Sequence, residues 1–212
     1  MPIRVLLADD HAVVLEGLRR ILDRPGFQIV GAVRDGRDLV KAAADLGPDL
    51  VIADVSMPVL NGIDAARQIL KSDRRTKIVF LSMHPDVTYA MEALNAGASG
   101  YVLKNEAGEE LLRAIRGVLE GRTYVTPSLD EPVKRALQDR RTRSRGNQAS
   151  LTSRQREVLQ LLVEGKKAKE IARVLNVSTR TVEFHKYRIM EALGLKTVAE
   201  LASYAFKHGM IA

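Results

Sequence analysis

The sequence predicts an α/β domain, with a five-stranded doubly wound parallel sheet, followed by a smaller all-α domain of four helices. In residues 1–121, short apolar stretches alternate five times with stretches of helical periodicity. This alternation is typical of βα units with helices on both faces of a parallel sheet. In residues 151–212, helical periodicity continues without a strand-like stretch. Residues 122–150 are predicted to be a basic linker between the two domains.

The strand at residues 50–53 is the clearest in the first domain, because it lies between Pro48 and Pro58 and is too short and too uniformly apolar for a surface helix. The other elements follow from the same change of period along the chain. The predicted strands are 3–8, 28–34, 50–53, 77–81 and 100–103, and the predicted helices are 11–24, 37–45, 61–72, 86–96 and 107–120.

Capping signals mark the helices of the second domain. Thr152 and Gln155 have capping-box spacing before a helix at 153–164, which ends at Gly165. Residues 176–178 form a turn between helices at 168–175 and 179–193, and Ser178 can cap the second of these. Two short helices across such a turn form a helix-turn-helix. A fourth helix at 198–207 follows Gly194.

Composition limits the classes of function. The 212 residues include no cysteine, which excludes disulfides and thiolate metal sites. No N-terminal apolar signal or membrane-length apolar stretch is present, so a soluble, cytoplasmic protein is expected. The net charge is −2 over residues 1–121, +4 over 122–150 and +5 over 151–212. This distribution indicates a sensing domain tethered to a domain that contacts a polyanion.

The linker is polar and basic, and residues 140–147 are especially rich in arginine. Its second half is therefore predicted to be flexible. A short helix at 130–139 would place Val133, Ala136 and Leu137 on one side.

Acidic, hydroxyl and basic residues stand just beyond several predicted strands. Asp9 and Asp10 follow the first strand, Asp54 the third, Ser82 the fourth and Lys104 the fifth. Clustered carboxylates repel one another unless a cation such as Mg²⁺ lies among them. With an ammonium and a hydroxyl nearby, such a site would stabilise a phosphoryl group accepted by a nucleophilic Asp54. A helix cap, a turn residue and a solvated lysine are the ordinary alternatives for Asp10, Ser82 and Lys104.

Four motifs resemble the receiver domain of two-component response regulators: Asp9-Asp10, Asp54-Val55-Ser56-Met57-Pro58, Leu81-Ser82 and Tyr101-Val102-Leu103-Lys104. The resemblance covers residues 1–121 and implies a flavodoxin-like fold. It also implies a role for each matching residue. By this resemblance, Asp54 would be the phosphoacceptor, and Asp9, Asp10, Asp54 and the backbone carbonyl of Ser56 would hold Mg²⁺. Lys104 would contact the phosphoryl group, and Ser82 and Tyr101 would be the switch pair.

The second domain is similar to the LuxR-type effector domain of the NarL/FixJ class. The similar segments are 151–159, 169–172 and 177–185. Helix 179–193 would then lie in the DNA major groove, and the helix at 198–207 would form a dimer. The candidate DNA-binding residues are Lys169, Ser178, Thr179, Arg180, Glu183, Phe184, Lys186, Tyr187, Arg188 and Lys196, and the candidate dimer residues are Val198, Leu201, Ala202 and Ala205.

These features predict a non-enzymatic transcriptional regulator that is phosphorylated on Asp54. Its expected partners are a sensor histidine kinase, double-stranded DNA with inverted half-sites, and a second copy of the chain, at least when phosphorylated. A Mg²⁺-dependent phosphohydrolase also uses a strand-end aspartate, but it needs an acid two residues later, where this chain has Ser56. A DNA-binding regulator that works without phosphorylation is a further alternative.

Overall fold

The computed structural model describes residues 1–142, 151–207 and 210, which fall into two compact units. The first unit ends at Thr142 and the second contains the remaining residues. Each unit is described by itself. Among the described helices, none is long and apolar enough to cross a membrane.

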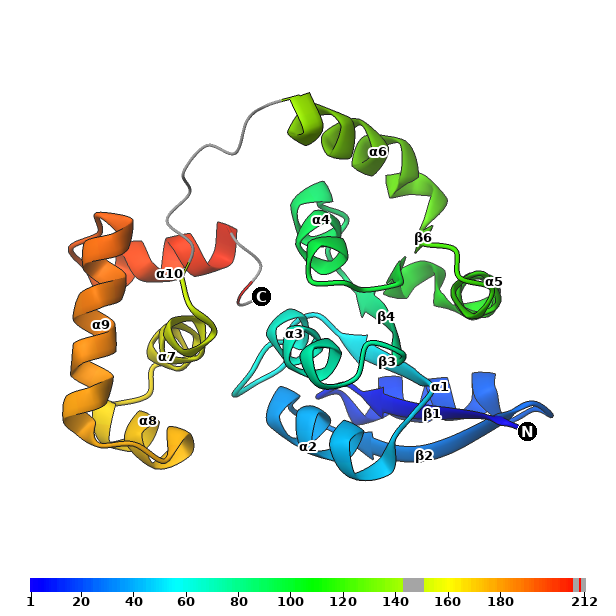
Figure 1. Ribbon diagram of the computed structural model, residues 1–212, viewed down its shortest axis with the longest axis horizontal. Coiled ribbons are helices and arrows are strands. Elements are labelled where there is room, and N and C mark those ends of the chain that lie inside the picture. The colour runs from blue at the N-terminus through cyan, green and yellow to red at the C-terminus, as the bar shows by residue number, and fades with distance from the viewer. Residues whose placement is uncertain (143–150, 208–209, 211–212) are drawn as a thin grey trace. The chain divides into compact units, whose positions relative to one another are not determined.

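The first unit contains a parallel sheet in the order β2-β1-β3-β4-β5-β6 (Figure 1). The sheet has one strand more than predicted, because Tyr124 and Val125 pair with Gly100 and Tyr101 of the fifth strand. The strands are β1 (Ile3–Ala8), β2 (Phe27–Val33), β3 (Leu50–Asp54), β4 (Lys77–Ser82), β5 (Gly100–Leu103) and β6 (Tyr124–Val125).

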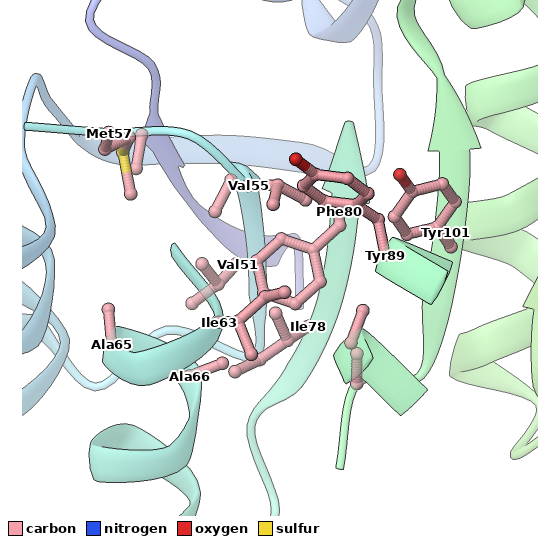
Figure 2. Packing of buried hydrophobic residues seen from close by; sticks show 14 of the residues in the cluster. Val51, Val55, Met57, Ile63, Ala65, Ala66, Ile78, Phe80, Tyr89 and Tyr101 are labelled. Carbon is pink, nitrogen blue, oxygen red and sulfur yellow. The ribbon is translucent and has the colours of Figure 1, made fainter. Parts of the chain in front are cut away.

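Helices cover both faces of this sheet. On one face, α1 (Ala12–Leu22) and α5 (Ala107–Leu119) pack against alternate strand residues such as Leu7 and Ile52. On the other face, α2 (Gly36–Leu46), α3 (Gly62–Ser72) and α4 (Val87–Asn95) pack against the intervening residues. Figure 2 shows part of this second cluster, in which Val51, Ile78 and Phe80 lie with Ile63 of α3. The doubly wound architecture is therefore confirmed.

Residues 122–142 belong to the first unit, which differs from the predicted linker at 122–150. After β6, the helix α6 (Pro127–Thr142) packs against α4 (Figure 1). Leu129 and Val133 are 5% and 2% exposed and join the core on that face. One helical turn separates them, so both point to the same side. The predicted flexible segment falls largely on residues 143–150, which lie outside the described residues.

The second unit contains α7 (Ser153–Val163), α8 (Ala168–Leu175), α9 (Thr179–Leu193) and α10 (Val198–Lys207). Thr152 and Gln155 form the predicted capping box, and Oγ of Ser178 accepts a hydrogen bond from the backbone N–H of Thr181 at 3.1 Å. Asn176 ends α8 in the left-handed conformation with φ 52°, which asparagine adopts more readily than most residues. The four helices share one core, which includes Val158, Ile171, Leu175, Val182, Ile189 and Leu201.

Candidate functional site

The carboxyl end of the sheet brings the predicted acidic and basic residues together. Asp54 is the last residue of β3, Asp9 follows β1, and Lys104 follows β5. Ala8 is paired with Ala53 in register, so the first and third strands end side by side. Side chains that follow parallel strands collect at this edge of an α/β sheet, as they do here.

Lys104 bridges two buried carboxylates. Its Nζ atom lies 2.8 Å from Oδ2 of Asp54 and 2.8 Å from Oδ2 of Asp9. Burial raises the pKa of Asp54, and the hydrogen bond and positive charge of Lys104 offset only part of that effect. For Lys104, burial lowers the pKa, but the hydrogen bonds and charges of Asp54 and Asp9 outweigh it, so the pKa is raised. Lys104 therefore stays protonated beside Asp54.

An acidic cluster consistent with a metal site surrounds Asp54. Ligand atoms of Asp9, Asp10, His11 and Asp54 all lie within 4.8 Å of one another. Asp9 and Asp54 are buried, whereas Asp10 and His11 are exposed. Carboxylate oxygens are the donors that hard divalent cations prefer. The backbone N–H of Ser56 hydrogen-bonds the Asp54 carboxylate, and the role of the Ser56 carbonyl stays a prediction.

The side chains of Ser82 and Tyr101 are both hydrogen-bonded to the backbone of His84. The hydroxyl of Tyr101 donates to the backbone carbonyl of His84 at 2.9 Å, and the His84 N–H donates to Oγ of Ser82 at 3.1 Å. Both Ser82 and Tyr101 are fully buried. Burial raises the pKa of Tyr101, so its hydroxyl remains a donor. The predicted pair is thus connected through the backbone of one residue.

His84, two residues after Ser82, and Tyr89 of α4 complete this region. The ring of His84 stacks on Tyr89 of α4, with centroids 4.3 Å apart and planes 6° apart. Its Nε2 lies 3.4 Å from Oγ of Ser56. Figure 2 shows Tyr89 and Tyr101 with both hydroxyls pointing toward the carboxyl ends of the strands. Five positions separate His84 from Tyr89 in the chain, and α4 begins between them. This spacing was the only sequence signal for the stacking of the two rings.

The helix-turn-helix of the second unit presents a polar and aromatic face. Val182 and Ile189 of α9 are buried, while Phe184 and Tyr187 remain 59% and 64% exposed. These two rings are three residues apart on one helix, so they form a local apolar patch of the kind that marks an interaction site. The other candidate DNA-binding residues are also at least partly exposed: Lys169, Ser178, Thr179, Arg180, Glu183, Lys186, Arg188 and Lys196.

Ser178 and Arg188 are among the candidates that have partners within the domain. Oγ of Ser178 is held by Thr181, as a helix cap requires. Arg188 Nη1 lies 2.8 Å from Oε2 of Glu191 in an exposed ion pair. Such exposed pairs contribute little stability and open easily, so the pair leaves Arg188 available to another anion.

The predicted dimer surface of α10 needs correction. Leu201 and Ala205 are fully buried in the core of their own domain, so they are closed to a partner chain. On a helix, apolar residues four apart form one face, and in α10 that face packs inward. The large apolar residues of α10 that are exposed are Val198 and Phe206, at 47% and 56%, and Ala202 is half-buried.

Comparison with known proteins identifies both domains. Residues 5–116 match the response regulator receiver domain, and residues 149–205 match the luxR family of bacterial regulatory proteins. Response regulator UvrY of Escherichia coli (strain K12) is 35% identical over 210 residues, covering 98% of this chain and 95% of UvrY. Oxygen regulatory protein NreC of Staphylococcus aureus (strain bovine RF122 / ET3-1) is 39% identical over 215 residues, covering 98% and 99%.

The likeness extends to solved structures. RcsB from Salmonella enterica serovar Typhimurium, bound to promoter rprA in the presence of phosphomimetic BeF3-, has a TM-score of 0.60 and 28% identity, covering 95% of this chain and 98% of that one. Matches in both domains set aside the phosphohydrolase alternative. The chain belongs to the two-component response regulators of the NarL/FixJ class, non-enzymatic transcriptional regulators that join a receiver domain to a LuxR-type DNA-binding domain.

Proposed function

We propose that Asp54 accepts a phosphoryl group from a sensor histidine kinase and that this phosphorylation controls DNA binding in the cytoplasm. The observation that carries the proposal is the contact of the Lys104 ammonium with the buried Asp54 carboxylate, at 2.8 Å. A carboxylate oxygen of Asp54 attacks phosphorus while the P–N bond of the phosphohistidine breaks and its electron pair stays on nitrogen. Lys104 then binds the added phosphoryl oxygens.

The acidic cluster holds Mg²⁺ in this proposal, through Asp9, Asp10, Asp54 and the backbone carbonyl of Ser56. The donor set fits, because carboxylate oxygens from the end of β3 and from the residues that follow β1 lie within 4.8 Å of one another. When bound, this ion would supply positive charge close to the phosphoryl oxygens. The protein contributes the nucleophile, the Lys104 ammonium and the burial of Asp54, which excludes water from the attacking carboxylate.

In this proposal, Ser82 and Tyr101 respond to the phosphorylation of Asp54. The Ser82 hydroxyl hydrogen-bonds the phosphoryl group, and the change passes to Tyr101 through the backbone of His84, which contacts both side chains. His84 also touches α4 through its stack on Tyr89. A shift at Ser82 therefore reaches the surface of the receiver at α4 by direct contacts.

The DNA-binding part of the proposal rests on α9. RcsB, which shares both domains, has been solved on a promoter. We place α9 in the major groove, with Lys169, Thr179 and Lys196 at phosphates and the exposed aromatic face near base edges. Two protomers of a homodimer read inverted half-sites, and Val198 and Ala202 contribute to its α10 surface.

Mass spectrometry of the intact chain tests the central step. The chain is incubated with Mg²⁺ and acetyl phosphate, and the expected product carries one phosphoryl group. Asp54→Asn and wild-type chain treated with a chelator should both remain unmodified. An adduct that persists in Asp54→Asn would show that another residue accepts the phosphoryl group.

A further inference from the structure

His11 occupies the N-cap position of α1 but makes no side-chain capping bond. Asp35, Asn61 and Asp86 cap the helices α2, α3 and α4 of the same unit with their side chains, as residues at this position usually do. The imidazole of His11 instead turns toward the acidic cluster. Its direction is therefore explained by the cluster and not by the helix.

The distances around His11 match those between neighbouring ligands of one ion. Nδ1 lies 2.8 Å from Oδ1 of Asp10 and 3.3 Å from Oδ1 of Asp9. Two donors at right angles, each about 2.1 Å from an octahedral ion, are about 3 Å apart. The Nδ1 atom is also within 4.8 Å of the Asp54 ligand atom. The nitrogen thus lies where a cation held by the carboxylates would meet it.

Lys104 and His11 approach different oxygen atoms of the acidic cluster. Its ammonium contacts Oδ2 of Asp9 and Oδ2 of Asp54, whereas His11 approaches Oδ1 of Asp9. The side chain of His11 is 68% exposed, so its ring lies at the solvent edge of the cluster. The two oxygens of Asp9 therefore face different groups: the ammonium of Lys104 at Oδ2 and the ring of His11 at Oδ1.

We propose that Nδ1 of His11 is a ligand of the divalent cation, so that the site prefers first-row transition ions such as Mn²⁺ to Mg²⁺. Imidazole nitrogen suits transition metals, whereas Mg²⁺ takes oxygen ligands almost exclusively. The inference rests on the cation site proposed above and adds a nitrogen donor to it. A proton on Nδ1 that is shared with Asp10 is the alternative explanation of the same distances.

Pulsed electron paramagnetic resonance of bound Mn²⁺ distinguishes metal ligation by Nδ1 from a hydrogen bond to Asp10. A directly bound imidazole gives ¹⁴N modulation of the electron spin echo. The full-length chain, without a polyhistidine tag, is loaded with one equivalent of Mn²⁺. We expect histidine modulation in the wild type, a change of its frequencies on ¹⁵N-histidine labelling, and its loss in His11→Asn. Asparagine is chosen because it caps helices well.

His84→Ala is the matched control, since His84 is the other histidine near the site and should leave the modulation intact. Bound Mn²⁺ without nitrogen modulation would overturn the role of His11. So would modulation that survives in His11→Asn. If Mn²⁺ binding is unchanged in Asp9→Asn, then both the proposed cation site and this inference fail, whereas nitrogen-free binding that depends on Asp9 removes only the inference.

Titration calorimetry measures the selectivity of the site between Mn²⁺ and Mg²⁺. His11→Asn should weaken Mn²⁺ binding by about tenfold or more, the size typical for loss of a group that supports a metal site, and should change Mg²⁺ binding by less than about threefold, because Mg²⁺ does not depend on nitrogen donors. An equal loss of affinity for both ions contradicts the proposed preference. No difference for either ion shows that Nδ1 makes only a hydrogen bond.

Discussion

The Nζ atom of Lys104 lies 2.8 Å from Oδ2 of Asp54, although 50 residues separate them in the chain. The side chains are 11% and 7% exposed, so water screens this ion pair only weakly. Any group that joins Asp54 must be accommodated by this ammonium. Lys104 is therefore the first side chain to respond to a change at Asp54.

Replacement of Lys104 by alanine should separate phosphorylation from response. We expect Lys104→Ala to accept the phosphoryl group more slowly, because it loses a charge that stabilises the phosphoryl oxygens. It should also fail to dimerise when phosphorylated, since nothing then fixes the phosphoryl group against Ser82. Mass spectrometry measures the first effect and sizing chromatography the second. Dimerisation equal to that of the wild type would remove Lys104 from the switch.

The pH dependence of phosphorylation follows from the raised pKa of Asp54. Only the ionised carboxylate is a nucleophile, so the initial rate should fall as the pH decreases through the folded pKa, which lies above the ordinary value of 3.8. Lys104 lowers this pKa, so the profile of Lys104→Ala should move to higher pH. The comparison uses a phosphodonor whose own ionisation does not change over this range. A profile at or below the ordinary value contradicts the effect of burial.

The same raised pKa has a consequence for stability. A folded pKa above the unfolded value means that folding disfavours the ionised form of Asp54. This cost is fully present above the folded pKa and disappears as the pH falls below 3.8. Asp54→Asn should therefore raise the midpoint of thermal unfolding of the receiver at neutral pH, with little effect near pH 3. A lower midpoint at neutral pH would show that the Lys104 contact outweighs burial.

Docking of α6 on the receiver can be tested by truncating one buried side chain. Leu129 is 5% exposed, so Leu129→Ala should destabilise the receiver by about 2–5 kcal/mol, the usual cost of such a change in a core. Leu137 of the same helix is 37% exposed, and Leu137→Ala should cost about 0.5 kcal/mol or less. Urea unfolding measures both. Equal small effects would show that α6 does not belong to the folded receiver in solution.

Most of the fold could be predicted because its signals are local. The bounds of α8, α9 and α10 agree with prediction to the residue, since caps or turns limit each of them. The sixth strand was missed because Tyr124 and Val125 are too few to show a period. A helix was predicted at 130–139, and α6 extends it by three residues at each end. These ends were missed because the start has a proline and a serine, and the arginine-rich end has no apolar period.

The residues of the candidate site could also be predicted only in part. Topology alone places residues that follow parallel strands at one edge, so Asp9, Asp54 and Lys104 could be grouped from sequence. The position of His11 depends on a side-chain rotamer, which no sequence period encodes. For α10, an apolar stripe predicts a buried face without saying what covers it, and Leu201 proved to face its own domain.

The two ends of α9 are expected to read DNA differently. Thr179 and Arg180 lie in the first turn, where backbone N–H groups and positive charge suit phosphate contacts. Glu183 and Tyr187 are exposed farther along the helix, one turn apart and on one side, so they can reach base edges. Contacts to phosphates and contacts to bases have different signatures in binding experiments.

Arg180→Ala should weaken binding to all sequences alike and reduce the salt slope by about one, because one phosphate contact is lost. Glu183→Ala should instead change the preferred base at one position in each half-site, since a glutamate accepts a hydrogen bond from the cytosine amino group. Salt titrations on one operator measure the first effect, and selection from a randomised DNA pool measures the second. An unchanged preferred site in Glu183→Ala would assign base reading to Lys186 and Arg188, which lie on the same helix.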